Sequence, residues 1–169
     1  MANGASRTLF WVVAGVAVVA DFVTKLIAVA TLTRLPVRVM GDFVTFQLVY
    51  NPGAAFGIHV GDYSRWVFMA LALLALVVLG SMVRQTHASQ WVRLTALGAV
   101  CGGAVGNLID RFRSARGVVD FIDVGVGNFR WPTFNVADMA VSCGAVVLAV
   151  VLWSDGRDSD ERAEDPAAA

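Results

Sequence analysis

The sequence predicts an all-α integral membrane protein with four transmembrane helices and a small β-sheet after the first helix. Of its 169 residues, 57% are hydrophobic, and the mean hydropathy is +0.68. Four apolar stretches, at residues 9–30, 66–83, 91–109 and 136–153, each have about the 17–25 residues that a helix needs to cross a hydrocarbon core. None alternates as a membrane β-barrel strand does, so residues 1–153 are predicted to form one helical membrane domain.

The first stretch could be read as a cleaved signal peptide, because Arg7 precedes it. It is too long for a typical signal-peptide core and carries Asp21 and Lys25 near its far end, so we expect a retained helix. Lys25, the only lysine, follows Asp21 by four residues on the same helical face, which favours an ion pair.

Residues 31–65 are predicted to form a small sheet at the membrane surface. The segments 37–40 and 43–50 are rich in β-branched and aromatic residues and are separated by Gly41 and Asp42, which indicates two short strands. Asn51, with the proline and glycine that follow it, ends the second strand.

The link between the second and third helices, residues 84–90, is short, which predicts antiparallel neighbours. The third helix has a glycine every four residues, and this spacing lets another helix approach closely. The same small-residue face ends in polar groups. The glycines are Gly98, Gly102 and Gly106, and the polar residues are Asn107, Asp110 and Arg111.

The remaining segments carry less information. Residues 113–132 are predicted to be looped because of their glycines, and residues 154–169 to form a disordered acidic tail without chemistry. Cys101 and Cys143 lie inside apolar helices without CxxC spacing, so we interpret both as buried packing thiols. Net charge is zero and the basic residues are scattered, so the sequence gives no support for nucleic-acid binding.

Four helices place both termini on one side of the membrane. The presumed inner segments carry five arginines and the opposite side carries seven, so the positive-inside rule alone would invert the protein. Several of the seven lie in polar motifs, where we expect them to have local roles.

Nucleophilic catalysis finds little support. His59 and His87 lie on opposite sides of the predicted membrane, and no GxSxG elbow is present. A Ser–Lys pair would have to use Lys25, which is predicted to be ion-paired. Carboxylates alone could still bind a metal ion, so this alternative stays open. The carboxylates are few, however, and no histidine or cysteine accompanies them, so we predict neither metal nor cofactor.

The chemistry is therefore predicted to reside in the aspartates, of which there are seven before the tail, without any glutamate. Asp42 and Asp62 follow glycines and are interpreted as solvated turn residues, and Asp110 as an ion-pair partner of Arg111. Asp120 and Asp138 have no basic neighbour at helical spacing and lie among apolar residues. Ionisable groups near a bilayer usually serve function.

Two carboxylates that meet can share one proton and activate water for hydrolysis. Asn107 and Asn135 stand beside the carboxylates, and asparagine can bind both the carbonyl and the amide of a peptide. A helix-capping role fits Asp138 poorly given its spacing from Asn135, but it stays open for Asp120.

Five motifs together resemble the lipoprotein signal peptidase (signal peptidase II) family. They occur in the family's order and cover all but the tail. They are Asp21-Phe22-Val23-Thr24-Lys25, Asn51-Pro52-Gly53-Ala54-Ala55-Phe56-Gly57, Gly102-Gly103-Ala104-Val105-Gly106-Asn107-Leu108-Ile109-Asp110-Arg111, Gly117-Val118-Val119-Asp120-Phe121-Ile122 and Phe134-Asn135-Val136-Ala137-Asp138.

The resemblance implies an aspartic endopeptidase of the bacterial inner membrane that cleaves diacylglyceryl prolipoproteins just before the lipidated cysteine. The catalytic pair would be Asp120 and Asp138. The supporting residues would be Asn51, Asn107, Asp110, Arg111, Asn135, Asp21 and Lys25. The resemblance also implies cytoplasmic termini, a periplasmic β-sheet cradle over the substrate, and a site near the periplasmic face. We expect a monomer in contact with membrane lipid.

Three other classes of protein fit the sequence less well. A proton-coupled transporter or channel subunit would place aspartates near helix midpoints and show inverted repeats, and neither is visible. A presenilin-type protease would place both aspartates within helices, against the predicted loop position of Asp120. A structural assembly factor would not explain five polar motifs.

Overall fold

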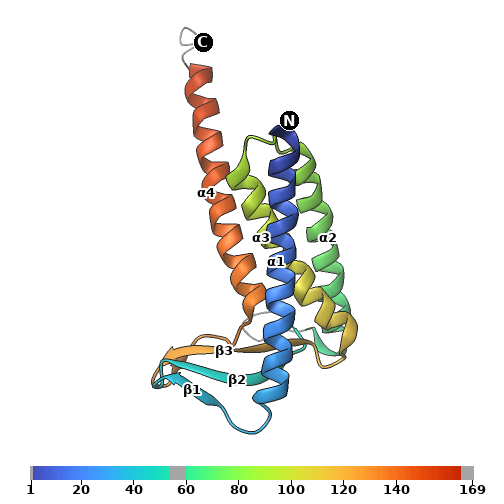
Figure 1. Cartoon of the computed structure of the whole chain (residues 1–169), viewed down its shortest axis with the longest axis vertical. Coiled ribbons are helices and arrows are strands. Elements are labelled where there is room, and N and C mark those ends of the chain that lie inside the picture. Colours follow the sequence, from blue (N-terminus) through green and yellow to red (C-terminus); the bar gives the residue numbers. More distant parts are fainter. Residues whose placement is uncertain (1, 54–59, 165–169) are drawn as a thin grey trace.

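The computed structural model describes residues 2–53 and 60–164. Four helices run side by side, a small sheet lies at one end of the bundle, and both termini lie toward the other end (Figure 1). In chain order the elements are α1 (Ala2–Thr31), β1 (Val37–Met40), β2 (Val44–Asn51), the 3-10 turn η2 (Gly61–Tyr63), α2 (Ser64–Gln85), α3 (Trp91–Arg113), β3 (Val118–Val126), β4 (Phe129–Arg130) and α4 (Val136–Glu164).

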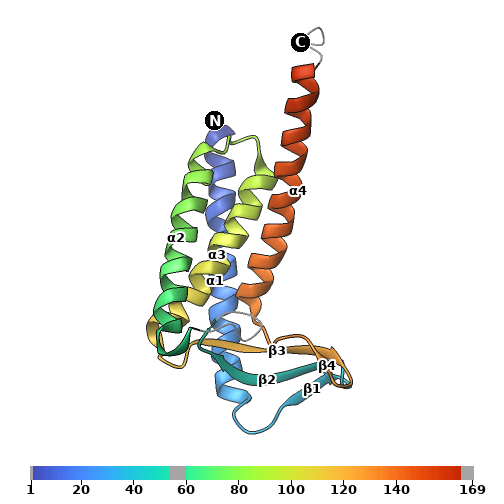
Figure 2. The ribbon, with the colours of Figure 1, turned by 180° about the vertical axis from the view of Figure 1, so that it is seen from behind.

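All four long helices are long and apolar enough to cross a membrane, which confirms the predicted helical architecture. Helix α3 is the most buried of them and packs between α1 and α4, with α2 also against it (Figure 2). The outer faces of the others expose large apolar side chains such as Val16, Val77 and Val146. Such faces suit contact with lipid rather than with water.

The glycine spacing in α3 has the predicted effect. A Cβ added to Gly98 would lie 2.8 Å from the Phe10 carbonyl oxygen of α1, and one added to Gly102 would lie 2.6 Å from that of Ala14. Gly103 lies equally close to the backbone of Ala137 in α4. The absence of side chains therefore lets α3 approach two helices at once, and this close packing brings the polar end of α3 against both of them.

The sheet is larger than predicted. Its four antiparallel strands follow the order β1-β2-β3-β4, and β3 and β4 arise from residues 113–132, which we expected to be looped. Residues 118–124 are mostly β-branched or aromatic, and β3 is largely buried, so they form a continuous apolar strand rather than an alternating one. The flanking Gly117 and Gly127, both with positive φ, mark the turns at the ends of this strand instead of loosening it.

Helix α4 is also longer than predicted. Residues 154–164 continue the helix, so the expectation of disorder is wrong for them, and residues 165–169 lie outside the described part. Extending an existing helix avoids the cost of nucleation, and no proline occurs between the start of α4 and Pro166. The other three helices similarly run a few residues past their apolar stretches, because helices retain charged ends that hydropathy excludes.

The two cysteines are both free. Cys101 is buried in the bundle core, as predicted, but Cys143 is exposed on α4, so its prediction as a buried thiol is wrong. The exposed face of α4 is apolar, which is why hydropathy alone could not separate it from a packed face.

Candidate active site

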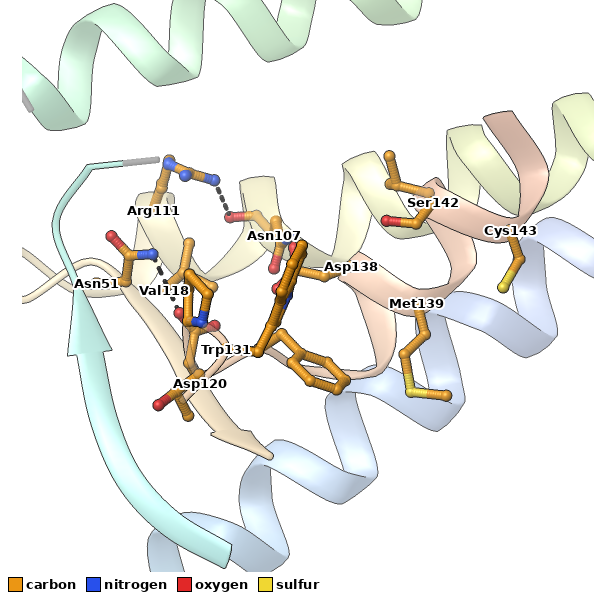
Figure 3. Close-up of a pocket in the computed structure, with 14 residues that line it drawn as sticks. Asn51, Asn107, Arg111, Val118, Asp120, Trp131, Asp138, Met139, Ser142 and Cys143 are labelled. Atoms are coloured by element: carbon orange, nitrogen blue, oxygen red, sulfur yellow. Dashed lines mark hydrogen bonds between the residues drawn. The ribbon is translucent and has the colours of Figure 1, made fainter. Parts of the chain in front are cut away.

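The polar ends of α3 and α4 meet β3 around a cavity of about 540 Å³, here called the active-site cavity (Figure 3). Its wall includes both carboxylates singled out from the sequence, Asp120 and Asp138, together with Asn51, Asn107 and Arg111. On the side toward the bundle the wall follows α4 through Met139 and Val141 to Ser142 and Cys143. The cavity therefore joins a polar end to a more apolar wall on a membrane-spanning helix.

Asp120 lies in β3, not in a loop as we expected, and is only 2% exposed. Strand pairing sets its direction: Asp120 pairs with Val49 and Val118 pairs with Asn51, so Asp120 and Asn51 stand on the same sheet face. Asn51 Nδ2 donates to Asp120 Oδ2 at 3.1 Å, and Asn135 Nδ2 donates to Oδ1 at 2.7 Å.

Asp138 lies in the first turn of α4. Its Oδ1 accepts a hydrogen bond from Asn107 Nδ2 at 2.7 Å, and its Oδ2 accepts one from the Asn135 backbone N–H at 3.2 Å. Asn135 Oδ1 in turn accepts the Asp138 backbone N–H at 2.9 Å. This reciprocal pair is a capping box. The expectation that a capping role fits Asp138 poorly is therefore wrong, and the residue both starts the helix and faces the cavity.

Asn135 connects the two carboxylates. The residue is completely buried, and its Nδ2 also lies 3.1 Å from Asn107 Oδ1 and 3.3 Å from the Val119 carbonyl oxygen. With its side chain on Asp120 and its backbone N–H on Asp138, it fixes both acids against one cavity. The sequence suggested Asn135 as a peptide-binding group, whereas the structure places it as the bridge of the pair.

The pKa of Asp120 is raised to about 6, first because burial penalises its ionised form and second because the negative charge of Asp138 lies nearby. Hydrogen bonds from Asn51 and Asn135 act in the opposite direction and do not cancel the rise. Asp120 therefore keeps its proton to a higher pH than an ordinary aspartate. A pair of acids that holds one proton near neutral pH can act as acid and base together.

Lys25 is buried outside the active-site cavity, with 4% of its surface exposed, and each of its three ammonium N–H groups has an acceptor. Its Nζ is 2.8 Å from Asp21 Oδ2, 2.8 Å from Asp110 Oδ2 and 2.9 Å from Asn107 Oδ1. The predicted pair with Asp21 is confirmed. The predicted pair between Asp110 and Arg111 is wrong, because adjacent residues of a helix point in different directions.

The same cluster joins four elements. Asp21 Oδ1 accepts the Ala137 backbone N–H at 2.9 Å, and Asp110 Oδ2 accepts that of Val119 at 3.1 Å. Through Lys25, helices α1 and α3 are thus tied to the start of α4 and to β3 one residue before Asp120. These contacts position the two acids rather than line the cavity.

The Arg111 side chain extends from α3 toward the residues that follow β2. Its Nη2 donates to the Gly53 carbonyl oxygen at 2.9 Å and its Nη1 to that of Asn107 at 3.3 Å. Its Nε is buried and has no hydrogen-bond partner within residues 2–53 and 60–164. A buried donor without an acceptor is costly, so this N–H group has an unused capacity to bind an acceptor.

The other titratable groups lie elsewhere. The Asp42 side chain is 75% exposed beside Arg38, and Asp62 is also exposed, in agreement with solvated turns. His87 is exposed in the link after α2, and His59 lies outside the described residues. Within the described ranges, no three His, Cys, Asp or Glu side chains gather where they could hold a metal ion.

Sequence reasoning overlooked one residue of the cavity wall and one anchor of the neighbouring hairpin. Trp131 lines it, next to the hairpin of β3 and β4. Asp123 anchors that hairpin through Arg130, whose Nη2 is 2.9 Å from Asp123 Oδ2, and Gln47 Nε2 donates to the same oxygen at 3.0 Å. In the sequence, Asp123 shows the same signal as Asp120, an acidic residue within an apolar run. In the structure it points away from the catalytic candidates, because strand residues three apart face opposite sides of the sheet.

Comparison with known proteins gives concordant results. The family described as Signal peptidase (SPase) II matches residues 13–154. A lipoprotein signal peptidase of Rhodococcus jostii is 45% identical over 153 residues, covering 86% of this chain and 72% of the relative. One from Cupriavidus pinatubonensis is 39% identical over 155 residues, covering 88% and 85%. A solved bacterial membrane enzyme superposes with a TM-score of 0.76 at 29% identity, covering 87% and 88%.

Proposed function

This chain belongs to the signal peptidase II family, and from that premise we propose that it is an aspartic endopeptidase with Asp120 and Asp138 as its catalytic pair. As a member of this family it is a protease that removes signal peptides from prolipoproteins. The observation that carries the catalytic proposal is the bridge made by Asn135, which holds two acids on one cavity. The proposed substrate carries a diacylglyceryl group on the cysteine after the cleaved bond.

The proposed mechanism uses one proton on the pair. Asp138, ionised, takes a proton from a water molecule as the water oxygen bonds to the scissile carbonyl carbon. Asp120 gives its proton to the carbonyl oxygen, which yields a neutral tetrahedral intermediate. When the C–N bond breaks, the proton on Asp138 passes to the leaving nitrogen and a hydroxyl proton returns to Asp120. The pair ends in its starting state.

The supporting residues have distinct proposed roles. Arg111 Nε donates to a backbone carbonyl oxygen of the substrate, because it is the buried donor of the site that lacks an acceptor among the described residues. Asn51 and Asn107 hold one carboxylate each. The buried ion pairs of Lys25 with Asp21 and Asp110 act indirectly, because they fix the helices and the strand that carry the two acids.

The family and the four spanning helices indicate a multi-pass protein of the bacterial inner membrane. We further propose cytoplasmic termini, with the site and its sheet cradle at the periplasmic face. This orientation suits a lipid-anchored cleavage point at the bilayer surface. The orientation is also compatible with the excess of arginines on the sheet side of the membrane, because some of these arginines have local partners. Arg65 donates to the carbonyl oxygens of Arg111 and Phe112 near the end of α3, and Arg130 pairs with Asp123. We also propose that the protein works as a monomer.

A proton-coupled transporter or channel subunit is not favoured. Such a protein would use carboxylates along a path through the helices. Here Asp138 lies in the first helical turn and Asp120 in a strand, and both face one cavity at the sheet end of the bundle.

The pH dependence of cleavage tests the proposed proton donor. Because the pKa of Asp120 is raised to about 6, rising pH should remove the proton that it donates. We expect kcat/KM for a diacylglyceryl prolipoprotein to fall about tenfold per pH unit well above the pKa of the donor. Asn51→Ala removes a hydrogen bond that favours ionised Asp120, so the falling limb should move to higher pH. A rate that is flat from neutral to alkaline pH in both proteins would exclude Asp120 as the donor.

A further inference from the structure

A second cavity, of about 210 Å³, opens where α3 ends beside α1 and β2, and its lining has no described residue in common with the active-site cavity. We propose that this cavity binds the phosphate of an anionic phospholipid through Arg113 and Arg116. The inference goes beyond the peptidase reaction, because it concerns the membrane around the enzyme rather than its substrate.

The two arginines are held in place by aromatic rings. The guanidinium carbon of Arg113 lies 5.0 Å from the ring centroid of Phe22, and that of Arg116 lies 3.9 Å from the ring centroid of Tyr50. Neither has a carboxylate within ion-pair distance in residues 2–53 and 60–164. A cation–π contact with a ring does not consume the N–H groups of a guanidinium, which can still bind an anion with two parallel hydrogen bonds.

The charge around the cavity also favours an anion. Its lining contains three basic residues and a single acidic one, Asp110. At the cavity floor Lys25 lies 2.8 Å from Asp110 and 2.8 Å from Asp21, and all three side chains are largely buried, so its ammonium is already shared by two carboxylates and adds no free positive charge to the cavity. The exposed rim is left with Arg113 and Arg116 and no compensating acid among the described residues.

The surroundings distinguish a lipid from a small ion. Arg113 is the last residue of a membrane-spanning helix, and its neighbour Phe112 is 57% exposed. On α1, Leu26 lines the cavity and is 49% exposed, and Ile27 beside it is 56% exposed. A phosphate that carries acyl chains can bind the arginines and cover these apolar side chains together, whereas inorganic phosphate can do only the first.

The proposal can be tested on the full chain purified in neutral detergent. Native mass spectrometry would count bound phosphatidylglycerol against phosphatidylcholine with the same acyl chains. We expect a preference for phosphatidylglycerol, and Arg113→Gln with Arg116→Gln should weaken it about fivefold for each arginine removed. A matched control is Arg34→Gln with Arg38→Gln, which removes two charges near the same end of the molecule without touching the cavity lining. This control should keep the preference.

Three results would overturn the proposal: an unchanged preference in the Arg113/Arg116 variant, an equal loss in the control, or displacement of the lipid by an equal concentration of inorganic phosphate. The last would identify a site for free phosphate. Should the double variant fail to fold, as judged by its thermal unfolding, Arg116→Gln alone must still lose about fivefold.

Discussion

Asp138→Asn should abolish prolipoprotein processing, with a loss of at least about 10³-fold, the scale of general acid–base catalysis. An amide cannot take the proton from the attacking water. The substituted side chain still carries an oxygen that can accept the Asn135 backbone N–H, so the capping box and the fold should survive. Asp120→Asn should give a loss of the same size, because its amide cannot donate an acidic proton to the carbonyl oxygen. Cleavage of a purified diacylglyceryl prolipoprotein, followed by gel shift, measures both.

Asp42→Asn is the matched control, since it makes the same chemical change at an exposed aspartate that does not line the cavity. It should cleave at nearly the rate of the unaltered protein. If either catalytic variant kept substantial cleavage, that residue would be removed from the pair. If Asp42→Asn lost as much as Asp138→Asn, the assignment of the site itself would be wrong.

Lys25→Met should lower the free energy of unfolding by about 3–5 kcal/mol, as expected when one partner of a buried ion pair is removed. Methionine keeps much of the apolar stem of the lysine but leaves Asp21 and Asp110 as buried carboxylates without their cation. The start of α4 and the strand before Asp120 should loosen with them, because Asp21 and Asp110 hold Ala137 and Val119. Thermal unfolding in detergent measures the loss.

A compensating variant separates stability from chemistry. Adding Asp21→Asn and Asp110→Asn to Lys25→Met removes the uncompensated charges, so part of the lost stability should return. A Lys25→Met protein that unfolds at the normal temperature but does not cleave would instead place Lys25 in the reaction.

The helices could be predicted from the sequence because lipid imposes a simple rule of length and polarity, and the glycines of α3 could be predicted because close helix packing needs small residues. Strand β3 could not be predicted in the same way. A short, continuous apolar run between glycines has no periodicity that separates a buried strand from a loop beside a membrane. The extension of α4 does not follow from composition, because an acidic, alanine-rich segment is typical of disorder, although a helix that is already formed can continue through such residues.

For the site, the sequence indicated which acids matter, because Asp120 and Asp138 stand among apolar residues without a local cation. The connections between them depend on contacts far apart in the chain. Lys25 lies 85 positions before Asp110, and no helical spacing could have placed its ammonium there. The bridging role of Asn135 likewise follows from β3 lying against the start of α4, which only the folded chain reveals.

The pairing of β2 with β3 has a consequence for how this protein can vary. Because consecutive side chains of a strand face opposite sides, a slip of one residue would turn Asp120 away from its partner acid while leaving every helix in place. Length changes are therefore forbidden between Gly117 and Asp120 but tolerable at the exposed tip near Gly127. A single-residue insertion in the first location should yield a well-folded, inert membrane protein, whose defect would be invisible to any measure of helix content.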